Sequence, residues 1–325
     1  MMIENFNLIR EFGNGNYQDC YDEIELSLRE MHEVKSLKVY RTRRSRLKYL
    51  ILGILSKIPI LTRFLFSKQP KASASLSLLM GGDFSVLLPN ILRSGNHYVY
   101  IYDAWPRFHH YIQARAELLQ IKAIFFSSKK VTALFNHRGS KIKAHWIPEG
   151  INLTDYKALM AEDRTIDVLE FGRKYQIYHD RIADTLAANG YKHLYEQESG
   201  KLVFKGRNNF LDALSRSKIS ICIPSNITHP ERAEEISSMT LRYLQSMASK
   251  CLIVGIMPDE MRELFDYLPI VEIDMNDAEA QIIEILQHYE RYHPLIDRNY
   301  EVVKQQHVWK NRLADMINII NNYEH

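Results

Sequence analysis

Short apolar runs alternate with amphipathic stretches along the chain from residue 75 onward. The first apolar runs have the length and composition of buried strands, and they cover 76–80, 98–102, 122–126 and 143–147. Amphipathic segments that favour helices lie between them, at 84–93, 107–119 and 129–137. Strands that alternate with helices in this way predict an α/β fold with doubly wound parallel sheets.

A second set of apolar runs follows a break in this pattern. Its members are 166–171, 191–195, 219–223, 251–256 and 269–273. The break, residues 148–165, is rich in Pro, Gly, Asn and Thr, which are typical of turns and caps rather than of a core. We therefore predict two domains, over residues 1–150 and 151–295.

The chain ends in helical sequence, at about 277–291 and then 296–323. An apolar stripe in the last part predicts that residues 296–325 form a C-terminal helix. Residues 1–34 contain acidic helical sequence around 21–33 and no recognisable chemistry. They are expected to cover the first sheet or to mediate self-association, so a homo-oligomer is an open option.

The positive charge of the chain is concentrated in one stretch. Residues 35–73 contain eleven Lys or Arg and no Asp or Glu. Because the whole chain carries +3 and this stretch +11, the remainder carries −8. A nucleic-acid partner is disfavoured, since the basic run is followed by aliphatic residues rather than interleaved with stacking aromatics.

The basic stretch has the pattern of a membrane-surface segment. The apolar run 49–66 follows a basic segment and is interrupted by Lys57, Pro59 and Arg63. A spanning helix needs about 20 largely uncharged residues, so we interpret 41–66 as lying at an anionic membrane surface. There each cation contributes about 1 kcal/mol. A core helix with a solvated basic flank is the alternative. The cations expected to face the lipid are Arg41, Arg43, Arg44, Arg46 and Lys48.

The cysteines and the N-terminal sequence bear on the compartment. Cys20, Cys222 and Cys251 are odd in number, and two of them lie in or beside apolar runs, so neither a disulfide framework nor a metal cluster is indicated. The first sixteen residues lack the pattern of a secretory signal. We expect a cytoplasmic protein associated peripherally with the membrane.

Several junctions between strands and helices are candidate anion sites. The strand 219–223 is followed by a polar loop and a helix that starts near Ser238. Backbone N–H groups at Ser238, Met239 and Thr240, with the positive end of the helix dipole, would bind a phosphate. A plain helix cap at Ser237 or Ser238 is the alternative interpretation.

Two further junctions carry glycine. Gly172 ends a strand and is followed by Arg173 and Lys174. The planar guanidinium of Arg173 would form a bidentate contact with a diphosphate, and the ammonium of Lys174 would supply a point charge. A solvated pair on a surface loop explains the same residues. Gly81 and Gly82 stand between a strand and a helix, where the missing Cβ atoms either admit a ligand or form a tight turn.

The order of these pieces resembles the group-1 glycosyltransferases of the GT-B fold, related to family 4 and especially to its spore-maturation-type branch. The resemblance covers roughly residues 75–320. The segments that carry it are AHWIPEGIN (144–152), DVLEFGRKY (167–175), IPSNI (223–227), TLRYLQSMASKCLIVG (240–255) and QQHVWKNRL (305–313) with Trp309.

The resemblance implies two doubly wound, Rossmann-like domains that face a central cleft. It also implies that the final helix, which carries Trp309, returns toward the N-terminal domain. It implies transfer of a sugar from a nucleotide diphosphate-sugar to a glycan or lipid-linked acceptor, with retention of configuration, for cell-surface polysaccharide. No cofactor and no metal are expected, because the sequence has neither a ligand-spaced group nor an Asp-x-Asp motif. The donor-binding residues that it implies are Gly172, Arg173, Lys174, Gly206, Arg207, Ser225, Ser238, Met239, Thr240 and Gln245.

The sequence departs from the family pattern at the donor helix. Family 4 members often carry two glutamates seven residues apart, and the matching positions here are Ser237 and Gln245. Gln245 keeps an acceptor and adds a donor, so it remains suitable for the ribose hydroxyls. Glu235 is our candidate for the missing carboxylate on the catalytic side.

The acceptor side has weaker candidates. Asp103, at the end of a predicted strand, is expected to orient or activate the acceptor hydroxyl, and a helix cap is its alternative role. Gly81, Gly82 and Trp105 are the remaining acceptor-side candidates, and His109 and His110 lie about two turns further on. A nucleotide-sugar epimerase of the same fold and a non-catalytic partner in glycan assembly are the rival functions. The sequence leaves the nucleobase, sugar, acceptor and linkage open.

Overall fold

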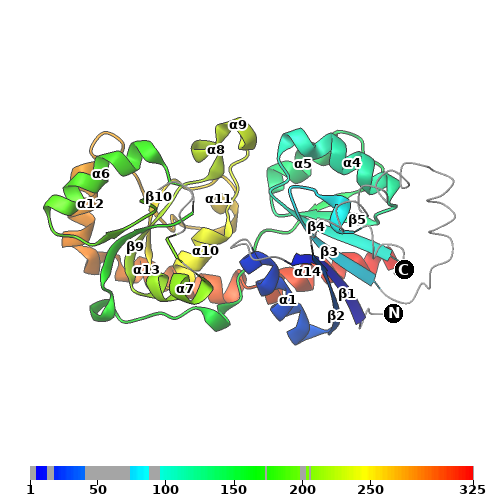
Figure 1. Ribbon diagram of the computed structural model, residues 1–325, viewed down its shortest axis with the longest axis horizontal. Coiled ribbons are helices and arrows are strands. Elements are labelled where there is room, and N and C mark those ends of the chain that lie inside the picture. The colour runs from blue at the N-terminus through cyan, green and yellow to red at the C-terminus, as the bar shows by residue number, and fades with distance from the viewer. Residues whose placement is uncertain are drawn as a thin grey trace. The chain divides into compact units, whose positions relative to one another are not determined.

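The computed structural model describes residues 5–12, 18–40, 74–87, 96–172, 174–197, 203–204 and 206–324. The proposed membrane segment 41–66, with its five named cations, lies outside these residues, and so does Arg173. The chain forms two compact units, of which unit 1 comprises residues 1–148 with 309–325 and unit 2 comprises 149–308 (Figure 1). Within the described part of the chain, no helix combines the length and apolarity that crossing a membrane requires.

Unit 1 is built on a parallel sheet with the strand order β2-β1-β3-β4-β5-β6. The strands are β1 (Asn5–Phe12), β2 (Glu33–Tyr40), β3 (Ala74–Met80), β4 (Asn96–Tyr102), β5 (Ala123–Phe126) and β6 (Ala144–Trp146). The central strands β3, β4 and β5 are almost wholly buried, which explains their continuous apolar sequences.

Helices cover both faces of this sheet, as the alternating pattern predicts. They are α1 (Gln18–Met31), α4 (His109–Leu118), α5 (Lys129–His137) and α14 (Trp309–Glu324), with short 3₁₀ turns η1 (Phe84–Val86) and η3 (Pro106–Phe108). In Figure 1, α4 and α5 lie on one side of the strands and α1 and α14 on the other.

The N-terminal residues both extend the sheet and cover it, because α1 packs on one face while β1 and β2 are strands. β1, α1 and β2 form a β-α-β unit, and β1 pairs in parallel with both β2 and β3. The sequence pattern predicts the helix but neither strand, because β1 and β2 carry polar residues at many positions. The structure therefore adds two strands that the sequence analysis did not predict: residues 5–12 form one, and the first six residues of the basic stretch, 35–40, belong to the outermost strand, β2.

Unit 2 contains a second parallel sheet, with the order β11-β10-β9-β7-β8. The strands are β7 (Ile166–Glu170), β8 (His193–Leu194), β9 (Ser217–Cys222), β10 (Leu252–Gly255) and β11 (Val271–Glu272). The outer strands β8 and β11 are shorter than the apolar runs 191–195 and 269–273 suggest.

The helices of unit 2 also divide between two faces. One apolar cluster joins β7, β9 and β10 to α6 and α12, through residues such as Val168, Ile182 and Ile282. The other joins β9 and β10 to α10 and α13, through Tyr243, Ile253 and Val303. The helices of unit 2 are α6 (Gln176–Ala188), α7 (Arg207–Ser215), α8 (Ser225–Thr228), α9 (Pro230–Ala233), α10 (Leu241–Ala248), α11 (Met261–Leu264), α12 (Ala278–Gln287) and α13 (His293–Gln306). Its 3₁₀ turns are η4 (Leu153–Asp155), η5 (Ala161–Asp163) and η6 (Tyr289–Tyr292).

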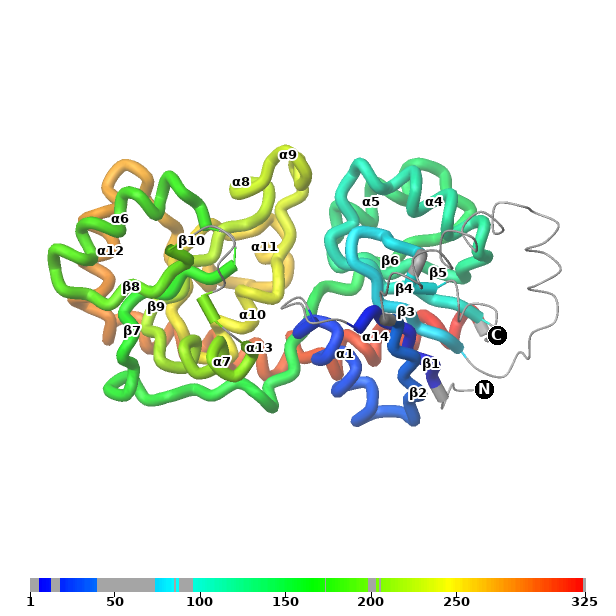
Figure 2. Tube along the Cα trace, in the orientation of Figure 1, coloured from blue at the N-terminus to red at the C-terminus, as the bar shows by residue number. Residues whose placement is uncertain are grey.

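The C-terminal segment forms two helices instead of one. α13 belongs to unit 2 and ends at Gln306, and α14 begins at Trp309 in unit 1 (Figure 2). The break coincides with a backbone bond from Ile151 N–H to the carbonyl of His307, next to the bridge between Ile151 and Val308. Trp309 is fully buried in unit 1, where its ring meets Tyr100 edge-on at 5.8 Å.

Candidate functional site

In unit 2, the carboxyl ends of two neighbouring strands meet the start of α10 at Arg242. Its guanidinium donates to the carbonyl oxygen of Phe171, just beyond β7, at 3.2 Å, and to that of Ile223, just beyond β9, at 3.0 Å. Arg242 also lies against Gly172, where an added Cβ would come within 3.0 Å of the arginine Cδ. The predicted segments 167–175, 223–227 and 240–255 are thus joined by one cationic side chain, which the sequence analysis did not single out.

The start of α10 attracts negative charge. The N–H of Met239 donates to a carboxylate oxygen of Glu260 at 3.2 Å, and that of Leu241 to a carboxylate oxygen of Glu149 at 3.0 Å. Carboxylates are favoured at this end of a helix by its dipole. The structure therefore modifies the prediction for Ser238–Thr240, because the Met239 amide is already engaged by a side chain of the protein.

Two hydroxyl groups near these strand ends are buried. Ser225 follows β9 and is 1% exposed, and Thr240 is the N-cap residue of α10. Among the described residues, neither hydroxyl oxygen has a hydrogen-bond partner. Thr240 makes no side-chain cap, so its hydroxyl group stays available for another acceptor or donor.

Gln245 and Arg207 are brought together by Tyr156. The side-chain amide of Gln245, which is 5% exposed, donates to the Tyr156 hydroxyl at 3.1 Å. The Arg207 guanidinium carbon lies 5.9 Å from the centre of the Tyr156 ring, and its Nη2 bonds Asp155 at 3.2 Å. Gly206 precedes α7 with an extended backbone. Tyr156 stands in the segment that the sequence analysis treated only as a domain boundary.

Lys174 turns away from Arg242. Its ammonium group lies 5.3 Å from the centre of the Tyr195 ring and donates to the carbonyl of Glu196 at 3.4 Å. Both partners follow β8. These two contacts hold the Lys174 side chain beside the outer strand β8. Lys174 would have to adopt a different rotamer to reach a diphosphate at Gly172.

The loop between α9 and α10 contains Ser237, which matches the first family glutamate, and Glu235, our candidate for the missing carboxylate. Glu235 is exposed, whereas Ser237 is 8% exposed and its hydroxyl accepts the Asp259 N–H at 3.2 Å. Ser237 therefore ties this loop to the start of α11. The catalytic assignment of Glu235 stays a prediction.

In unit 1, Asp103 follows β4 with a left-handed backbone, at φ 49°. Its carbonyl accepts the Trp105 N–H at 2.8 Å, and η3 is capped at Trp105 with no side-chain bond. The N-cap residues of η3 and α4 are Trp105 and Phe108, so Asp103 occupies neither position. Trp105 is 7% exposed, so most of its ring packs inside unit 1.

The glycine pair and the histidines of unit 1 are explained by packing. Gly81 and Gly82 have φ of 61° and 81°, and a Cβ on Gly82 would lie 2.6 Å from Ile112 on α4. The turn and the close helix thus account for both glycines. His109 is fully buried and its Nε2 lies 2.9 Å from the carbonyl of Ala104, whereas His110 is exposed.

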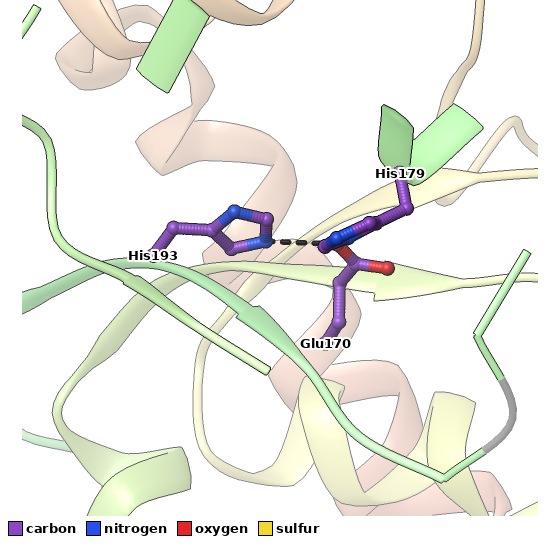
Figure 3. A group of neighbouring side chains, drawn as sticks. All are labelled: Glu170, His179 and His193. Atoms are coloured by element: carbon purple, nitrogen blue, oxygen red, sulfur yellow. Dashed lines mark hydrogen bonds and ion pairs between the residues drawn. The ribbon is translucent and has the colours of Figure 1, made fainter. Parts of the chain in front are cut away.

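A buried polar cluster in unit 2 was missed altogether. Glu170 Oε1 lies 2.7 Å from His179 Nδ1 and 2.8 Å from His193 Nε2, as Figure 3 shows. The three side chains are 5–7% exposed. Burial raises the pKa of Glu170, but the bonds from the two imidazoles outweigh it and hold the pKa below its ordinary value. Spacings of nine and fourteen residues match no ligand motif, so only the fold reveals the group.

Comparison with known proteins identifies this architecture. Residues 164–318 match the family model described as glycosyl transferase-like. No curated protein sequence matches the chain.

Three solved structures share the fold over nearly the whole chain. HepE of Anabaena, in complex with UDP and glucose, has a TM-score of 0.60 and 9% identity, covering 99% of this chain and 100% of its own. Sucrose-phosphate synthase of Thermosynechococcus elongatus has a TM-score of 0.60 and 11% identity, covering 98% of each chain. AviGT4, a glycosyltransferase involved in avilamycin A biosynthesis, has a TM-score of 0.56 and 14% identity, also covering 98% of each chain.

These likenesses confirm the predicted GT-B fold, with two parallel-sheet α/β units. The family match supplies the activity class for the unit that contains Arg242 and Gln245. Residues 164–318 are therefore glycosyl transferase-like, in a chain that has the GT-B fold.

Proposed function

We propose that the protein transfers a sugar from a nucleotide diphosphate-sugar, bound by unit 2, to a glycan or lipid-linked acceptor. The observation that carries the proposal is the position of Arg242, which bridges the ends of β7 and β9 at the start of α10. In doubly wound folds, ligands bind at the carboxyl ends of the strands. A fixed cation and a helix N-terminus at that edge suit a diphosphate.

The diphosphate is proposed to lie beside Gly172 and Arg242. When the bond between the sugar C1 and the diphosphate breaks, the bonding electrons leave with the diphosphate, and negative charge builds there. Arg242 and the amides at Ser238 and Thr240 are proposed to stabilise that charge. Glu149 and Glu260 hold the neighbouring amides in place.

The nucleoside is proposed to lie toward Gln245, Tyr156 and Arg207. Gln245 offers an amide to the ribose hydroxyls, and Tyr156 with Arg207 supplies a flat, cationic surface suited to a base. UDP is our first candidate nucleotide, because HepE was solved with UDP and glucose.

The new glycosidic bond forms between the sugar C1 and an acceptor oxygen, whose proton passes to an oxygen of the departing diphosphate. Asp103 is proposed to orient that acceptor and Glu235 to supply a carboxylate near C1. We propose retention of configuration and no divalent metal in the chemical step, since Arg242 and the helix end take the part that a metal plays in other transferases.

A location at the cytoplasmic face of a membrane and a role in surface polysaccharide synthesis complete the proposal. They rest on the basic and apolar sequence of 41–66. Sedimentation with phosphatidylserine vesicles should fall sharply when Arg41, Arg43, Arg44 and Arg46 are changed to Ala. Equal sedimentation of the variant would contradict the membrane part alone.

Donor binding is the direct test. A panel of nucleotide sugars is screened by thermal shift and by released nucleotide, with and without added Mg²⁺ or Mn²⁺. We expect one nucleotide class to bind, and turnover to be unchanged by either added metal. Arg242→Lys keeps the charge but loses the planar fork, so donor affinity should fall at least tenfold, or about 1.4 kcal/mol.

Arg262→Lys is the matched control, since Arg262 is an exposed arginine paired only at the surface of unit 2 with Glu272. Gln245→Ala provides a second variant at the nucleoside end, where a fivefold or larger rise in donor Kd is expected. If no nucleotide sugar binds the wild-type chain, the proposal is wrong. If binding is unaltered in both Arg242→Lys and Gln245→Ala, the donor lies elsewhere.

A further inference from the structure

The polar cluster of Glu170, His179 and His193 has a geometry that the transfer reaction does not use. We propose that it is a binding site for one divalent transition-metal ion, with Zn²⁺ as the first candidate. One atom of each residue, namely Glu170 Oε1, His179 Nδ1 and His193 Nε2, converges so that all three lie within 4.8 Å of one another (Figure 3).

The three ligands are positioned by regular structure rather than by loops. Glu170 is the last residue of β7, His193 is the first residue of β8, and His179 lies in the first turn of α6. Strands β7 and β8 pair directly, with Val168 opposite His193. Their register fixes the separation of the carboxylate and one imidazole before any ion binds, and such preorganisation favours metal binding.

Core packing fixes the third ligand. Helix α6 is anchored by Tyr178 and Ile182, both fully buried in the apolar cluster of this face. The Tyr195 ring packs against both imidazoles, with centroid distances of 4.5 Å to His179 and 4.6 Å to His193. The imidazoles are therefore held in place from two sides.

The charge of the cluster is incomplete. Glu170 is 5% exposed, and its Oε1 lies within hydrogen-bond distance of both imidazoles. Among the described residues, its charged and hydrogen-bonded partners are the two histidines, and no Lys or Arg is one of them. Burial penalises the ionised form of a carboxylate, and an imidazole supplies a positive charge only while it is protonated. A bound dication would remove this penalty.

The donor set selects the type of ion. Two imidazoles and one carboxylate are a known zinc ligand set, which leaves a fourth position for water. Mg²⁺ and Ca²⁺ prefer oxygen ligands and larger coordination numbers, so they suit the cluster poorly. Zinc bond lengths near 2.0–2.1 Å at tetrahedral angles separate the ligand atoms by about 3.3 Å. Glu170 Oε1 therefore has to withdraw by about half an ångström from each nitrogen, and the two nitrogens, which lie within 4.8 Å of one another, have to approach to about 3.3 Å.

Metal binding requires both imidazoles to be neutral, in the tautomers that leave a lone pair on the nitrogen facing the ion. His179 would carry its proton on Nε2 and His193 on Nδ1, so that the nitrogens now bonded to Glu170 present lone pairs to the ion. The site then holds a net charge of about +1, from one carboxylate and one dication, instead of an unmatched negative charge.

The test uses the full, untagged chain after dialysis against EDTA. Co²⁺ is titrated in and the visible absorption of tetrahedral Co²⁺ is recorded, then Zn²⁺ is added in competition and the bound metal is counted by mass spectrometry. We expect one equivalent of Co²⁺, displaced by one equivalent of Zn²⁺. The affinity should fall at least tenfold in Glu170→Gln and in His193→Asn.

The control pair is Glu284→Gln and His288→Asn. These residues lie one helical turn apart at the end of α12, and Glu284 is 57% exposed, so they represent ordinary surface binding by a carboxylate and an imidazole. Both variants should keep the full stoichiometry and affinity. If the control pair abolishes the absorption while Glu170→Gln retains it, the metal binds at the surface and the proposal is wrong.

The wild-type titration decides the matter even if a cluster variant fails to fold. Less than half an equivalent of bound metal on the folded wild-type chain overturns the proposal. With bound metal, slower hydrogen exchange in peptides covering 166–170 and 176–194, relative to the metal-free chain, supports it. None of these readouts depends on sugar transfer.

Discussion

Two buried carboxylates, Glu25 in unit 1 and Glu170 in unit 2, are neutralised in different ways. In unit 1, Glu25 on α1 accepts from Arg10 at 2.7 Å, from Arg29 at 2.9 Å and from the Ser36 hydroxyl at 2.5 Å. In unit 2, Glu170 accepts only from the imidazoles of His179 and His193, among the residues that the structure describes.

The difference lies in the permanence of the charge. An arginine stays protonated at every physiological pH, so the unit 1 cluster of Arg10, Glu25 and Arg29 is a complete ion-pair network. An imidazole can serve as a neutral donor or as a metal ligand. A carboxylate enclosed by imidazoles therefore remains open to a cation, and one enclosed by guanidinium groups does not.

The two clusters can be measured separately. The three tryptophans, Trp105, Trp146 and Trp309, all belong to unit 1, so tryptophan fluorescence reports the unfolding of that unit alone. Hydrogen exchange in peptides from β7, β8 and α6 reports unit 2.

The largest effect is expected from Arg10→Met. Arg10 is 2% exposed, and its loss leaves Glu25 with only the half-exposed Arg29 as a cationic partner. Breaking a buried pair typically costs about 3–5 kcal/mol, and the remaining Arg29 places the expected loss near the lower figure. The midpoint of the tryptophan transition in urea measures it.

Arg29→Met is the control for that measurement. The Arg29 side chain is 46% exposed, and exposed pairs contribute less than about 1 kcal/mol. Equal losses from Arg10→Met and Arg29→Met would show that burial does not set the strength of this network.

An intermediate effect is expected when the same substitution is made in both units. Glu25→Gln removes a charge-assisted bond from Arg10, so unit 1 should lose about 2 kcal/mol. Glu170→Gln keeps an oxygen that accepts both imidazole N–H groups and removes an unmatched charge. Metal-free unit 2 should therefore change by less than about 1 kcal/mol. A larger loss in unit 2, measured by hydrogen exchange, would show that its cluster is complete without a metal.

The acid response of unit 1 should depend on Glu25. Burial raises the pKa of Glu25, but the bonds from Ser36 and Arg29 and the charges of Arg10 and Arg29 lower it below 4.5. A lowered folded pKa means that this stabilisation is present above pH 4.5 and is lost as the pH falls through the folded value. The tryptophan transition of Glu25→Gln, followed from pH 7 to pH 3, should decline less steeply than that of the wild type. Parallel curves would refute this assignment.

The smallest effect is expected from zinc on unit 1. Zn²⁺ added to the EDTA-treated chain should slow exchange in β7 and α6 and leave the midpoint of the tryptophan transition unchanged. A ligand stabilises only the part of the protein that binds it. If zinc raised the tryptophan midpoint as much as it stabilised unit 2 against hydrogen exchange, the metal would not be specific to the Glu170 cluster.

The sequence predicted the fold well where apolar runs are continuous. β3, β4, β5, β7, β9 and β10 are buried on both faces, and their runs are visible without the structure. β1 and β2 were missed because β2 is the outermost strand and both carry polar side chains at many positions. The division of the last helix at 307–308 was missed because both halves are helical and only the passage between units separates them.

The candidate site was predicted in part. Gly172 and the start of α10 were placed at strand ends by their order in the chain, and Arg242 joins them in the structure. Arg242, Tyr156 and Glu149 were not expected, because a helical arginine, a tyrosine in a turn-rich segment and a glutamate after proline are common on any protein surface. Their roles depend on contacts 19–92 residues apart.

The alternation of apolar and amphipathic segments by itself determined two parallel α/β units, since each buried run needs a helix to return the chain to the next parallel strand. The tertiary structure alone decided that the imidazoles of His179 and His193 both contact one carboxylate oxygen of Glu170. Their meeting depends on the register of β7 with β8 and on the packing of α6 over both. Hydrogen bonds between strands and contacts between layers set that register, and neither is encoded by local spacing.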